Sequence, residues 1–471
     1  MLKTKIKNIT LLVMVLICIY LSSNVWLQLP EFFSPNAYED KEIEVTTEAD
    51  IWKVLRPIKN IIKYDDNYTV LYSDNRGLWK KALNVINNAF FDFSNSSVTE
   101  TAAFPSEYLK FDFNAYIPAE IFTGQMEIEN VNVNNTVKNI KNVIIDLKNN
   151  NSIYIYNGEN TIKIVSDKIN TKELTDIVKS LNFDSKTKYL SEQKIGAETI
   201  QVPVPLEQTV LNPVFVQSEL DVFDIGRINE IAKDYFKKDY DYVRKSVEVS
   251  GNLVYVYRTE KILKINEEGL LDFYDASFEP ENGSDVYKSF VSAVNFTEEF
   301  LGFPENGYLS SVENIHHEGN EGYRFTFSYN ILERPILFSR VRDNSALQID
   351  VVANNVVSYK RFIRKIDDKQ MGKMVQTQIL PAIEVISRNI DTSLNADVDE
   401  NNVAMENQES VIEQLKPIKP EMIKQINNIY LGYFDISRIS KEQVLRVVWV
   451  IETTEKTFIF NAISGLLIEE W

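Results

Sequence analysis

The sequence contains a single cysteine, Cys18, among its 471 residues. Because Cys18 lies in an apolar stretch near the N-terminus, the rest of the chain has no disulfide, no thiol nucleophile and no cysteine ligand for a metal. Histidine is almost as scarce, with only His316 and His317. Glycine is limited to 15 residues, and neither a P-loop nor a G-x-G-x-x-G motif occurs. These absences remove most of the patterns by which an enzyme is recognised.

The two histidines are adjacent, so their side chains point in different directions in any regular element and make a poor pair of metal ligands. We interpret them as residues of a polar surface loop. A serine hydrolase of the usual kind needs a histidine base, and the chain has no G-x-S-x-G motif. A serine–lysine pair stays open, but no spacing indicates one. We therefore predict no catalytic, cofactor-binding or metal-binding residues, and a protein that is not an enzyme.

The charge balance is acidic, with a formal net charge of −18, while 44% of the residues are hydrophobic and 11% are aromatic. Nucleic acids and anionic surfaces bind clustered lysine and arginine, so they are not predicted partners. The apolar residues suffice for folded cores, and the length predicts two or three domains. Without disulfides, these domains depend on packing for their stability.

The longest uncharged run covers residues 9–29. About 20 apolar residues cross a bilayer core as a helix. Lys3, Lys5 and Lys7 precede the run and acidic residues follow it, which predicts a single-pass protein of the cell membrane with a cytoplasmic N-terminus and an extracytoplasmic bulk. Trp26 fits the outer aromatic belt. The alternative is a cleaved signal peptide, but its core is usually shorter, about 7–15 residues, and Ser22-Ser23-Asn24 is a weak cleavage site.

Small or weakly polar residues recur every four positions in this run, so they share one face of a helix: Thr10, Met14, Cys18 and Ser22. Membrane helices associate through such faces. We therefore predict a contact surface for another membrane helix, with ordinary anchor composition as the alternative.

The residues that follow the predicted membrane helix are expected to form an elongated α+β region of several domains. The predicted divisions are a cytoplasmic N-terminus (1–8), the transmembrane helix (9–29), a tether (30–48), an N-terminal α+β domain (49–195), a central α+β domain (205–366) and a C-terminal α+β domain (367–471) with a polar excursion at about 391–416. The N-terminal domain combines strand-like runs with an amphipathic helix at 78–90 and a second helix at 171–181. Three prolines near its end mark the boundary.

Three segments of the C-terminal half share one pattern of strand, tight polar turn and second strand: 262–274, 347–359 and 458–468. Gly269, Asn355 and Gly465 stand where the turn tolerates a positive φ. Each hairpin follows a helical stretch, at 225–236, 284–300 and 371–390, and the last contains Pro381, where it can break. We interpret these as related helix-plus-hairpin units; the alternative is chance similarity between hairpins.

Several short stretches of the sequence are similar to the YycH family. A lysine-rich start and one helix end in Asn24-Val25-Trp26, and residues 51–57 read Ile-Trp-Lys-Val-Leu-Arg-Pro. Residues 341–350 resemble a strand region of the family's central domain, and residues 460–467 resemble its closing hairpin. The stretch between Asp92 and Asn150 diverges from it.

The resemblance implies a regulatory role. It implies association with a WalK-like sensor histidine kinase that controls cell-wall metabolism, joint action with the smaller paralogue YycI, and contacts through the membrane helices. It implies no catalytic residues and no cofactor. The leading hypothesis is thus a membrane-anchored regulator of a two-component system. The alternative is an exported module that binds a ligand or the wall, or inhibits a peptidase.

Overall fold

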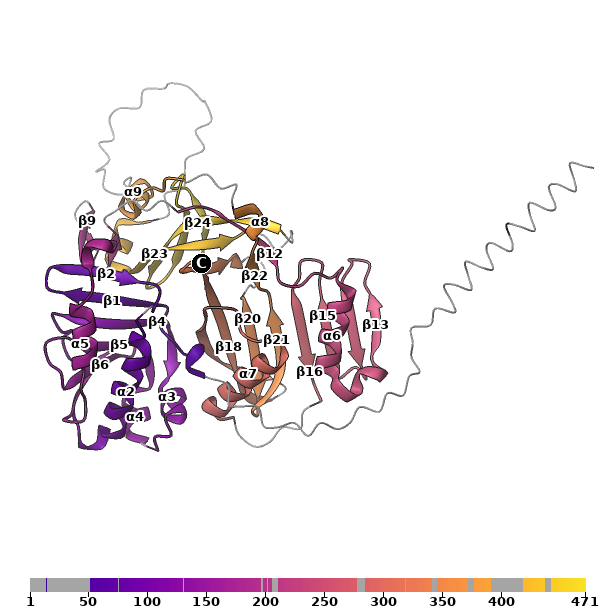
Figure 1. The fold of residues 1–471 in the computed structure, drawn as a ribbon, viewed down its shortest axis with the longest axis horizontal. Helices are drawn as coiled ribbons and strands as arrows, with labels where there is room; N and C mark the ends of the chain where they lie inside the picture. The colour runs from indigo at the N-terminus through magenta and orange to yellow at the C-terminus, as the bar shows by residue number, and fades with distance from the viewer. Residues whose placement is uncertain are drawn as a thin grey trace, which may run out of the picture.

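The computed structural model describes residue 14 and, from residue 51 onward, the ranges 51–74, 76–129, 131–195, 198–200, 202–205, 211–277, 284–317, 319–340, 345–371, 377–390, 418–436 and 442–471. Figure 1 shows their arrangement. Within these ranges no helix reaches the length and apolar character that crossing a membrane requires. The predicted membrane helix at 9–29 lies outside the described residues except for Met14, and the tether at 30–48 lies outside them altogether.

The N-terminal part is an antiparallel sheet of seven strands in the order β2-β1-β4-β5-β6-β7-β3. Its strands are β1 (Lys59–Tyr64), β2 (Asn67–Leu71), β3 (Ser97–Thr99), β4 (Tyr108–Pro118), β5 (Asn139–Asp146), β6 (Ser152–Tyr156) and β7 (Thr161–Val165). The helices of this part are α2 (Leu78–Phe91), α3 (Ala119–Gln125), α4 (Val131–Val137) and α5 (Lys172–Lys179).

Alternation along β4 separates the two faces of this sheet. Leu109, Phe111 and Phe113 are buried in the core that also contains the apolar residues of the helices. Trp79 of α2 packs on Phe111 and Phe113, with ring centroids 5.3 Å apart in both pairs. Side chains point to opposite faces in turn along a strand, so the even-numbered residues of this stretch face the other way. That second face carries the polar residues considered below.

The remaining strands form one hydrogen-bonded path in the order β13-β14-β15-β16-β21-β20-β18-β19-β23-β24-β12-β22, with β17 beside β18 and β25 and β26 following β24. The strands of its first half are β13 (Arg244–Val247), β14 (Leu253–Tyr257), β15 (Lys261–Ile265), β16 (Leu271–Asp275), β17 (Gly307–His317), β18 (Asn320–Ile331), β20 (Leu347–Val352) and β21 (Asn355–Arg361). Those of its second half are β12 (Val214–Ser218), β19 (Arg334–Phe338), β22 (Arg364–Ile366), β23 (Ile426–Asp435), β24 (Glu442–Thr453), β25 (Thr457–Asn461) and β26 (Leu467–Glu470).

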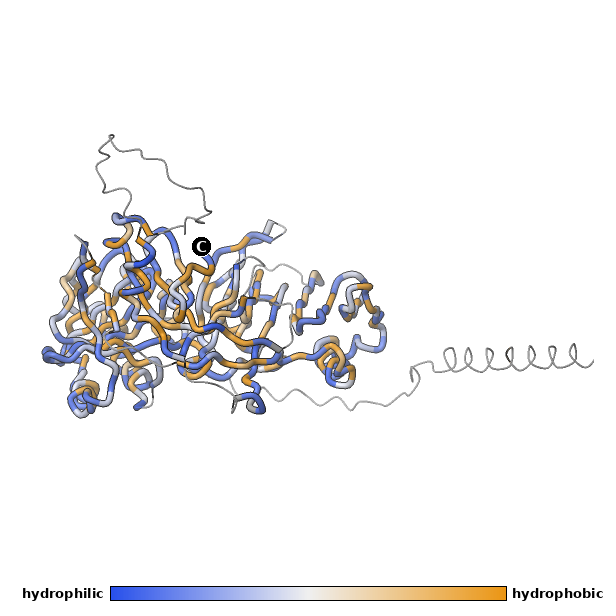
Figure 2. Tube along the Cα trace, turned by 90° about the horizontal axis from the view of Figure 1, so that it is seen from above, coloured by the Kyte–Doolittle hydropathy of each residue, from blue (hydrophilic) through white to orange (hydrophobic). Residues whose placement is uncertain are grey.

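Two helices cover the first half of this path. Helix α6 (Ile225–Phe236) begins at the N-cap Asp224, and helix α7 (Val286–Phe300) at the N-cap Asp285. Both caps accept a hydrogen bond from a backbone N–H of the first turn, as short polar side chains do at this position. The units of α6 and α7 join where β16 pairs with β21. Figure 2 shows hydrophobic and hydrophilic residues in alternation along the chain, the pattern that sheets with one buried face require.

The second half of the path carries α8 (Asp368–Met371) and α9 (Ala382–Arg388). Residues of α9 share a core with β23, β24 and β25, and the Trp449 indole N–H donates to the carbonyl of Leu380 over 2.8 Å. Strand β19 runs parallel to β23. Two small pairs complete the strands: β8 (Tyr189–Leu190) with β11 (Val204–Pro205), and β9 (Gln193–Ile195) with β10 (Glu198–Ile200).

The mixed α+β fold class is therefore confirmed for the described residues, and each predicted hairpin is present as β15–β16, β20–β21 and β25–β26. Gly269 and Gly465 have the predicted positive φ. The prediction for Asn355 is wrong: Ala353 and Asn354 take the positive φ, and Asn355 begins β21. The two-residue turn sits one position earlier than the pattern of aliphatic residues indicates. The domain limits stay predictions. Strand β12 precedes β13 in the chain but pairs with β22 and β24, so the sheet does not follow the order of the chain.

Candidate functional site at the junction of two sheets

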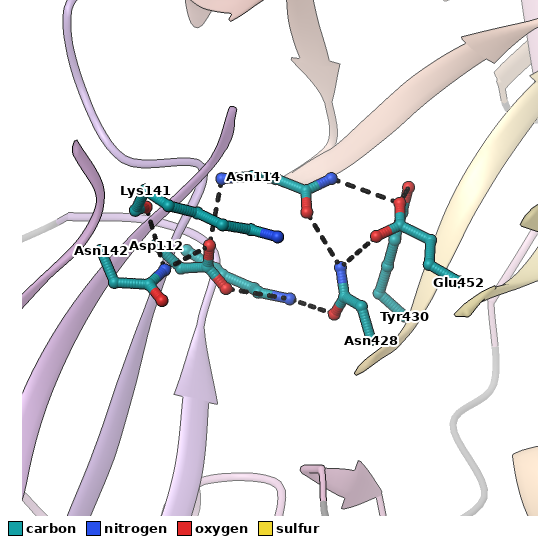
Figure 3. A network of polar contacts seen from close by, with 8 residues as sticks. Asp112, Asn114, Lys141, Asn142, Asn428, Tyr430 and Glu452 are labelled. Atoms are coloured by element: carbon teal, nitrogen blue, oxygen red, sulfur yellow. Dashed lines mark hydrogen bonds and ion pairs between the residues drawn. The ribbon is translucent and has the colours of Figure 1, made fainter. Parts of the chain in front are cut away.

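Polar side chains of the N-terminal sheet meet those of the C-terminal strands at a junction that Figure 3 shows from close by. Lys59 comes from β1 and Asp112 and Asn114 from β4. Across the junction, β23 contributes Asn428 and Tyr430, and β24 contributes Glu452. We call these six residues the junction network.

A buried ion pair lies on the N-terminal side. Lys59 is only 4% exposed, and its ammonium lies 3.6 Å from a carboxylate oxygen of Asp112. The same ammonium donates a hydrogen bond to the side-chain carbonyl of Asn428, and it lies 5.6 Å from the centre of the Tyr430 ring. The Lys59 ammonium therefore contacts Asp112 of its own sheet and both Asn428 and Tyr430 of β23.

A chain of amide contacts lies beside the ion pair. The Asn428 side-chain amide donates to Asn114 Oδ1 over 3.3 Å and to Glu452 Oε2 over 3.0 Å. Asn114 donates to Glu452 Oε1 over 3.2 Å, and the Tyr430 hydroxyl donates to the same oxygen over 2.9 Å. Glu452 thus accepts three hydrogen bonds, one of them from across the junction.

The surroundings keep the ionic form of Asp112 stable. Burial alone would raise its pKa, but Lys59, Lys110 and the backbone N–H of Asn114 outweigh burial, and the pKa is lowered. The Asn142 side chain also donates to this carboxylate over 2.9 Å. In contrast, burial and the neighbouring Glu452 carboxylate raise the pKa of Tyr430 well above its usual range. At neutral pH Asp112 is therefore ionised and Tyr430 is neutral.

Backbone contacts next to the network tie the same N-terminal region to β17. The N–H of Leu309 donates to the carbonyl of Val54 over 2.9 Å, and the guanidinium of Arg56 donates to the carbonyl of Gly307 over 3.1 Å. The N-terminal sheet is therefore held both by the C-terminal strands and by β17.

A second group of buried charges lies where the two halves of the long strand path meet. Arg361 of β21 binds Glu219 through two hydrogen bonds of 2.7 and 3.1 Å. Arg364 of β22 binds Asp435 of β23 over 2.8 Å, with both side chains fully buried. Paired arginine forks of this kind fix orientation as well as distance. Burial opposes ionisation of Glu219, but Arg361 and then Lys365 lower its pKa.

The chemistry of these groups is structural. In the described ranges, no group of three or more histidine, cysteine, aspartate or glutamate residues is placed to hold a metal ion. The junction network pairs its acceptors with amide, ammonium and hydroxyl donors, and it contains no serine or cysteine nucleophile. The arrangement can hold two sheets in a defined orientation and can transmit a change in that orientation.

The predicted helix-contact residues Thr10, Cys18 and Ser22, and the predicted topology residues Lys3, Lys5, Lys7 and Trp26, lie outside the described residues. Met14 is described as helical with an exposed side chain. This part of the prediction therefore stays untested.

The interpretation of His316 and His317 as loop residues is wrong. They are the last two residues of β17, paired with Glu321 and Asn320 of β18. The Nε2 atom of His317 lies 3.4 Å from the Tyr274 hydroxyl. The polar composition of this stretch reflects a hairpin end that extends into solvent, where polar residues are compatible with a strand.

Sequence analysis did not find the junction network. Its hydrogen bonds join residues far apart in the chain, with 369 positions between Lys59 and Asn428 and 338 between Asn114 and Glu452. One local signal was present: Lys59 and Asp112 are charged residues within apolar, strand-forming stretches. A charge in such a position needs a partner, but the sequence does not show which residue supplies it.

The fold and the junction define a multi-part α+β protein whose sheets are tied together by buried polar contacts. Residues 4–185 match the family described as YycH protein, N-terminal domain. This confirms the resemblance that the local sequence indicated.

Two solved structures align with the chain, and the first of them is similar in fold. The crystal structure of YycH from Bacillus subtilis aligns with a TM-score of 0.53 and 13% identity, covering 88% of this chain and 97% of that one. An uncharacterized protein from Eubacterium rectale aligns with a TM-score of 0.33 and 12% identity, over 55% of this chain and 86% of that one. A comparison with curated protein sequences finds no match.

Proposed function

We propose that the chain is a non-enzymatic, membrane-anchored regulator that associates with a sensor histidine kinase controlling cell-wall metabolism. The observation that carries the proposal is the family match over residues 4–185, which includes both the apolar run at 9–29 and the N-terminal sheet. The proposed partners are a WalK-like kinase and the smaller paralogue YycI, met through the membrane helix and through the exported region.

The energetic requirement on such a regulator is modest. It must bind two states of the kinase with different affinity, and a coupling of about 1–3 kcal/mol changes activity about 5- to 150-fold. Contacts between helices in lipid contribute about 0.6–2 kcal/mol each. A few side chains on one helix face therefore suffice.

The junction network fits this role because a regulator with a large exported region needs the parts of that region to move together. The N-terminal sheet follows the apolar run in sequence, and Lys59, Asn114 and their partners fix this sheet to the C-terminal strands. In the proposed mechanism, anything that displaces the C-terminal strands also displaces the N-terminal sheet.

The alternative, an exported ligand-binding, wall-binding or peptidase-inhibiting module, calls for a deep pocket with convergent polar groups. A depression runs along α5, lined by Asn170, Lys172, Glu173, Asp176, Ile177 and Ser180. It is open, and its lining lies on one short helix and the residues beside it. This geometry does not favour the alternative.

The test replaces residues 9–29 with an unrelated membrane helix of equal length and leaves the exported region intact. Co-purification with the kinase and output of the cell-wall pathway are then measured together. Loss of both supports a regulatory contact in this helix. Retention of both places the regulatory contact in the exported region, and if deletion of the whole chain also leaves pathway output unchanged, the proposed function is wrong.

A further inference from the structure

Strand β13 is the outermost strand of the long path, at the opposite end of the molecule from the N-terminal sheet (Figure 1). Among the described strands it pairs with β14 only. All four of its residues, Arg244 to Val247, are exposed. An edge strand of this kind presents backbone groups that can pair with another chain.

The alternation of hydrogen bonds along the β13–β14 hairpin shows which backbone groups of β13 are available to pair with another strand. At its turn, the N–H of Glu248 donates to the carbonyl of Asn252 over 2.9 Å. In an antiparallel pair, hydrogen-bonded residues alternate with residues whose backbone groups point away. Ser246 and Arg244 therefore bond to β14, opposite Val254 and Val256. The N–H and C=O groups of Lys245 and Val247 point outward from the sheet.

Apolar side chains are unusually exposed around this edge. Tyr242, which precedes the strand, is 76% exposed, and Val247 is 65% exposed. Val249, in the turn that follows, is 110% exposed on the same scale. Lysine on an edge strand commonly discourages pairing. Here, however, the ammonium of Lys245 is held away from the edge, 3.0 Å from Asn229 Oδ1 of α6 and 5.3 Å from the centre of the Tyr255 ring.

We propose that β13 is a dimer interface at which the strand pairs antiparallel with β13 of a second copy, around a two-fold axis at Ser246. In this register the outward backbone groups of Lys245 meet those of Val247 in the second copy, and the reverse, so each edge satisfies the other. A two-fold interface uses the same patch on both copies, and this strand is self-complementary in that sense.

The side chains fit the same register. Arg244 lies directly opposite Glu248 of the second copy, so two ion pairs of opposite charge form symmetrically. Within one copy, Glu248 binds Lys264 over 2.9 Å in an exposed ion pair. Exchanging such a pair for another costs little free energy. Val249, in the turn after the strand, comes near Val243 and Tyr242 of the second copy. One arrangement therefore uses the free backbone groups and covers the exposed apolar side chains.

The interface is short. Stable protein interfaces bury about 1,200–2,000 Å², and one four-residue edge with its flanking turn falls below that range. We therefore expect a weak dimer that cross-linking captures more readily than chromatography. The continuous sheet that it creates would place α6 of both copies on the same face.

The test uses the full chain with Cys18 replaced by serine, so that an introduced cysteine is the only thiol. At the two-fold axis, residue 246 faces itself in a non-hydrogen-bonded pair with Cα atoms about 4.5 Å apart, within reach of a disulfide. Ser246→Cys should yield a disulfide-linked dimer with oxidised glutathione. Arg244→Cys is the matched control, because its two copies lie four residues apart along the strands, about 13 Å, and should remain monomeric.

Charge exchange tests the register independently. In the Ser246→Cys chain, Arg244→Glu places two acidic residues opposite each other and should abolish the cross-link. Adding Glu248→Arg should restore it. Val247→Pro removes an N–H that points outward and leaves the hydrogen bonds to β14 in place, so it should also abolish the cross-link. An unchanged thermal unfolding midpoint would show that the hairpin of this variant is intact. Equal cross-linking of Ser246→Cys and Arg244→Cys, or no cross-linking of Ser246→Cys, would overturn the proposal, as would a cross-link that ignores the charge changes.

Discussion

Lys59 contacts residues on both sides of the junction, because one ammonium group binds an aspartate, an amide and an aromatic ring. A buried lysine is stable only when its charge is compensated. The compensation here comes from both sides of the junction, so the stability of the N-terminal sheet and its attachment to the C-terminal strands depend on the same side chain.

Lys59→Met should therefore be strongly destabilising. The substitution keeps the aliphatic length but leaves the buried Asp112 without its ion-pair partner, which costs about 3–5 kcal/mol when one partner of a buried pair is removed. Urea unfolding followed by circular dichroism measures the loss. The matched control is Lys80→Met, because Lys80 is exposed on α2. It should change stability by less than about 0.5 kcal/mol.

A second variant separates charge from packing. Adding Asp112→Asn to Lys59→Met removes the uncompensated carboxylate, so part of the lost stability should return. If Lys59→Met is no more destabilising than Lys80→Met, the ion pair does not hold the junction and the argument for a stiff connection between the two sheets fails.

At the scale of elements, β19 and β23 leave no space for a side chain at Gly432. A Cβ atom on Gly432 of β23 would lie 2.5 Å from Leu337 Cδ1 and 3.0 Å from the carbonyl oxygen of Pro335. The leucine methyl can move, but the backbone oxygen belongs to a paired strand. This position requires glycine because of space and not because of its backbone angles.

Gly432→Ala should consequently lower stability by about 1–3 kcal/mol, the usual cost of forcing extra volume into a packed region. Thermal unfolding of the variant measures it. Gly226→Ala in α6 is the control, since the nearest atom to its added Cβ is 3.7 Å away, and it should leave stability unchanged or raise it by up to about 1 kcal/mol. A neutral Gly432→Ala would mean that β19 and β23 are not held as closely as described.

A hairpin and a parallel strand pair show which parts of the fold the sequence predicts and which it does not. The hairpin β15–β16 could be predicted because Gly269 and its flanking apolar residues report a local turn. The parallel pairing of β19 with β23 could not, since it joins residues about a hundred positions apart and leaves no periodic signal. Helices α3 and α4 also went unpredicted, because at seven residues each they are too short for a clear helical period.

At the scale of the whole molecule, three kinds of connection hold the described parts together. Strand pairing joins the α6 and α7 units, buried arginine–carboxylate pairs join this sheet to the C-terminal strands, and the junction network joins the C-terminal strands to the N-terminal sheet. In Figure 1 the parts lie side by side in space, from the N-terminal sheet through the C-terminal strands and the α7 unit to β13 at the far end. A displacement at one end has a continuous path of packed and hydrogen-bonded groups to the other.

The proposed function places the partner at the anchor end of this path, on the helix face of Thr10, Met14, Cys18 and Ser22. Thr10→Leu and Ser22→Leu each add bulk where a second helix would approach closely. Either substitution should weaken co-purification with the kinase about 3- to 20-fold, the range expected for losing one contact between membrane helices of about 0.6–1.7 kcal/mol. Leu16→Ile, on a different face of the same helix, should leave co-purification unchanged. The thermal unfolding midpoint of the exported region should be the same in all three variants, because none of them touches its core. If both leucine variants retain the kinase as well as Leu16→Ile does, the contact lies elsewhere, and the search moves to the exported surface.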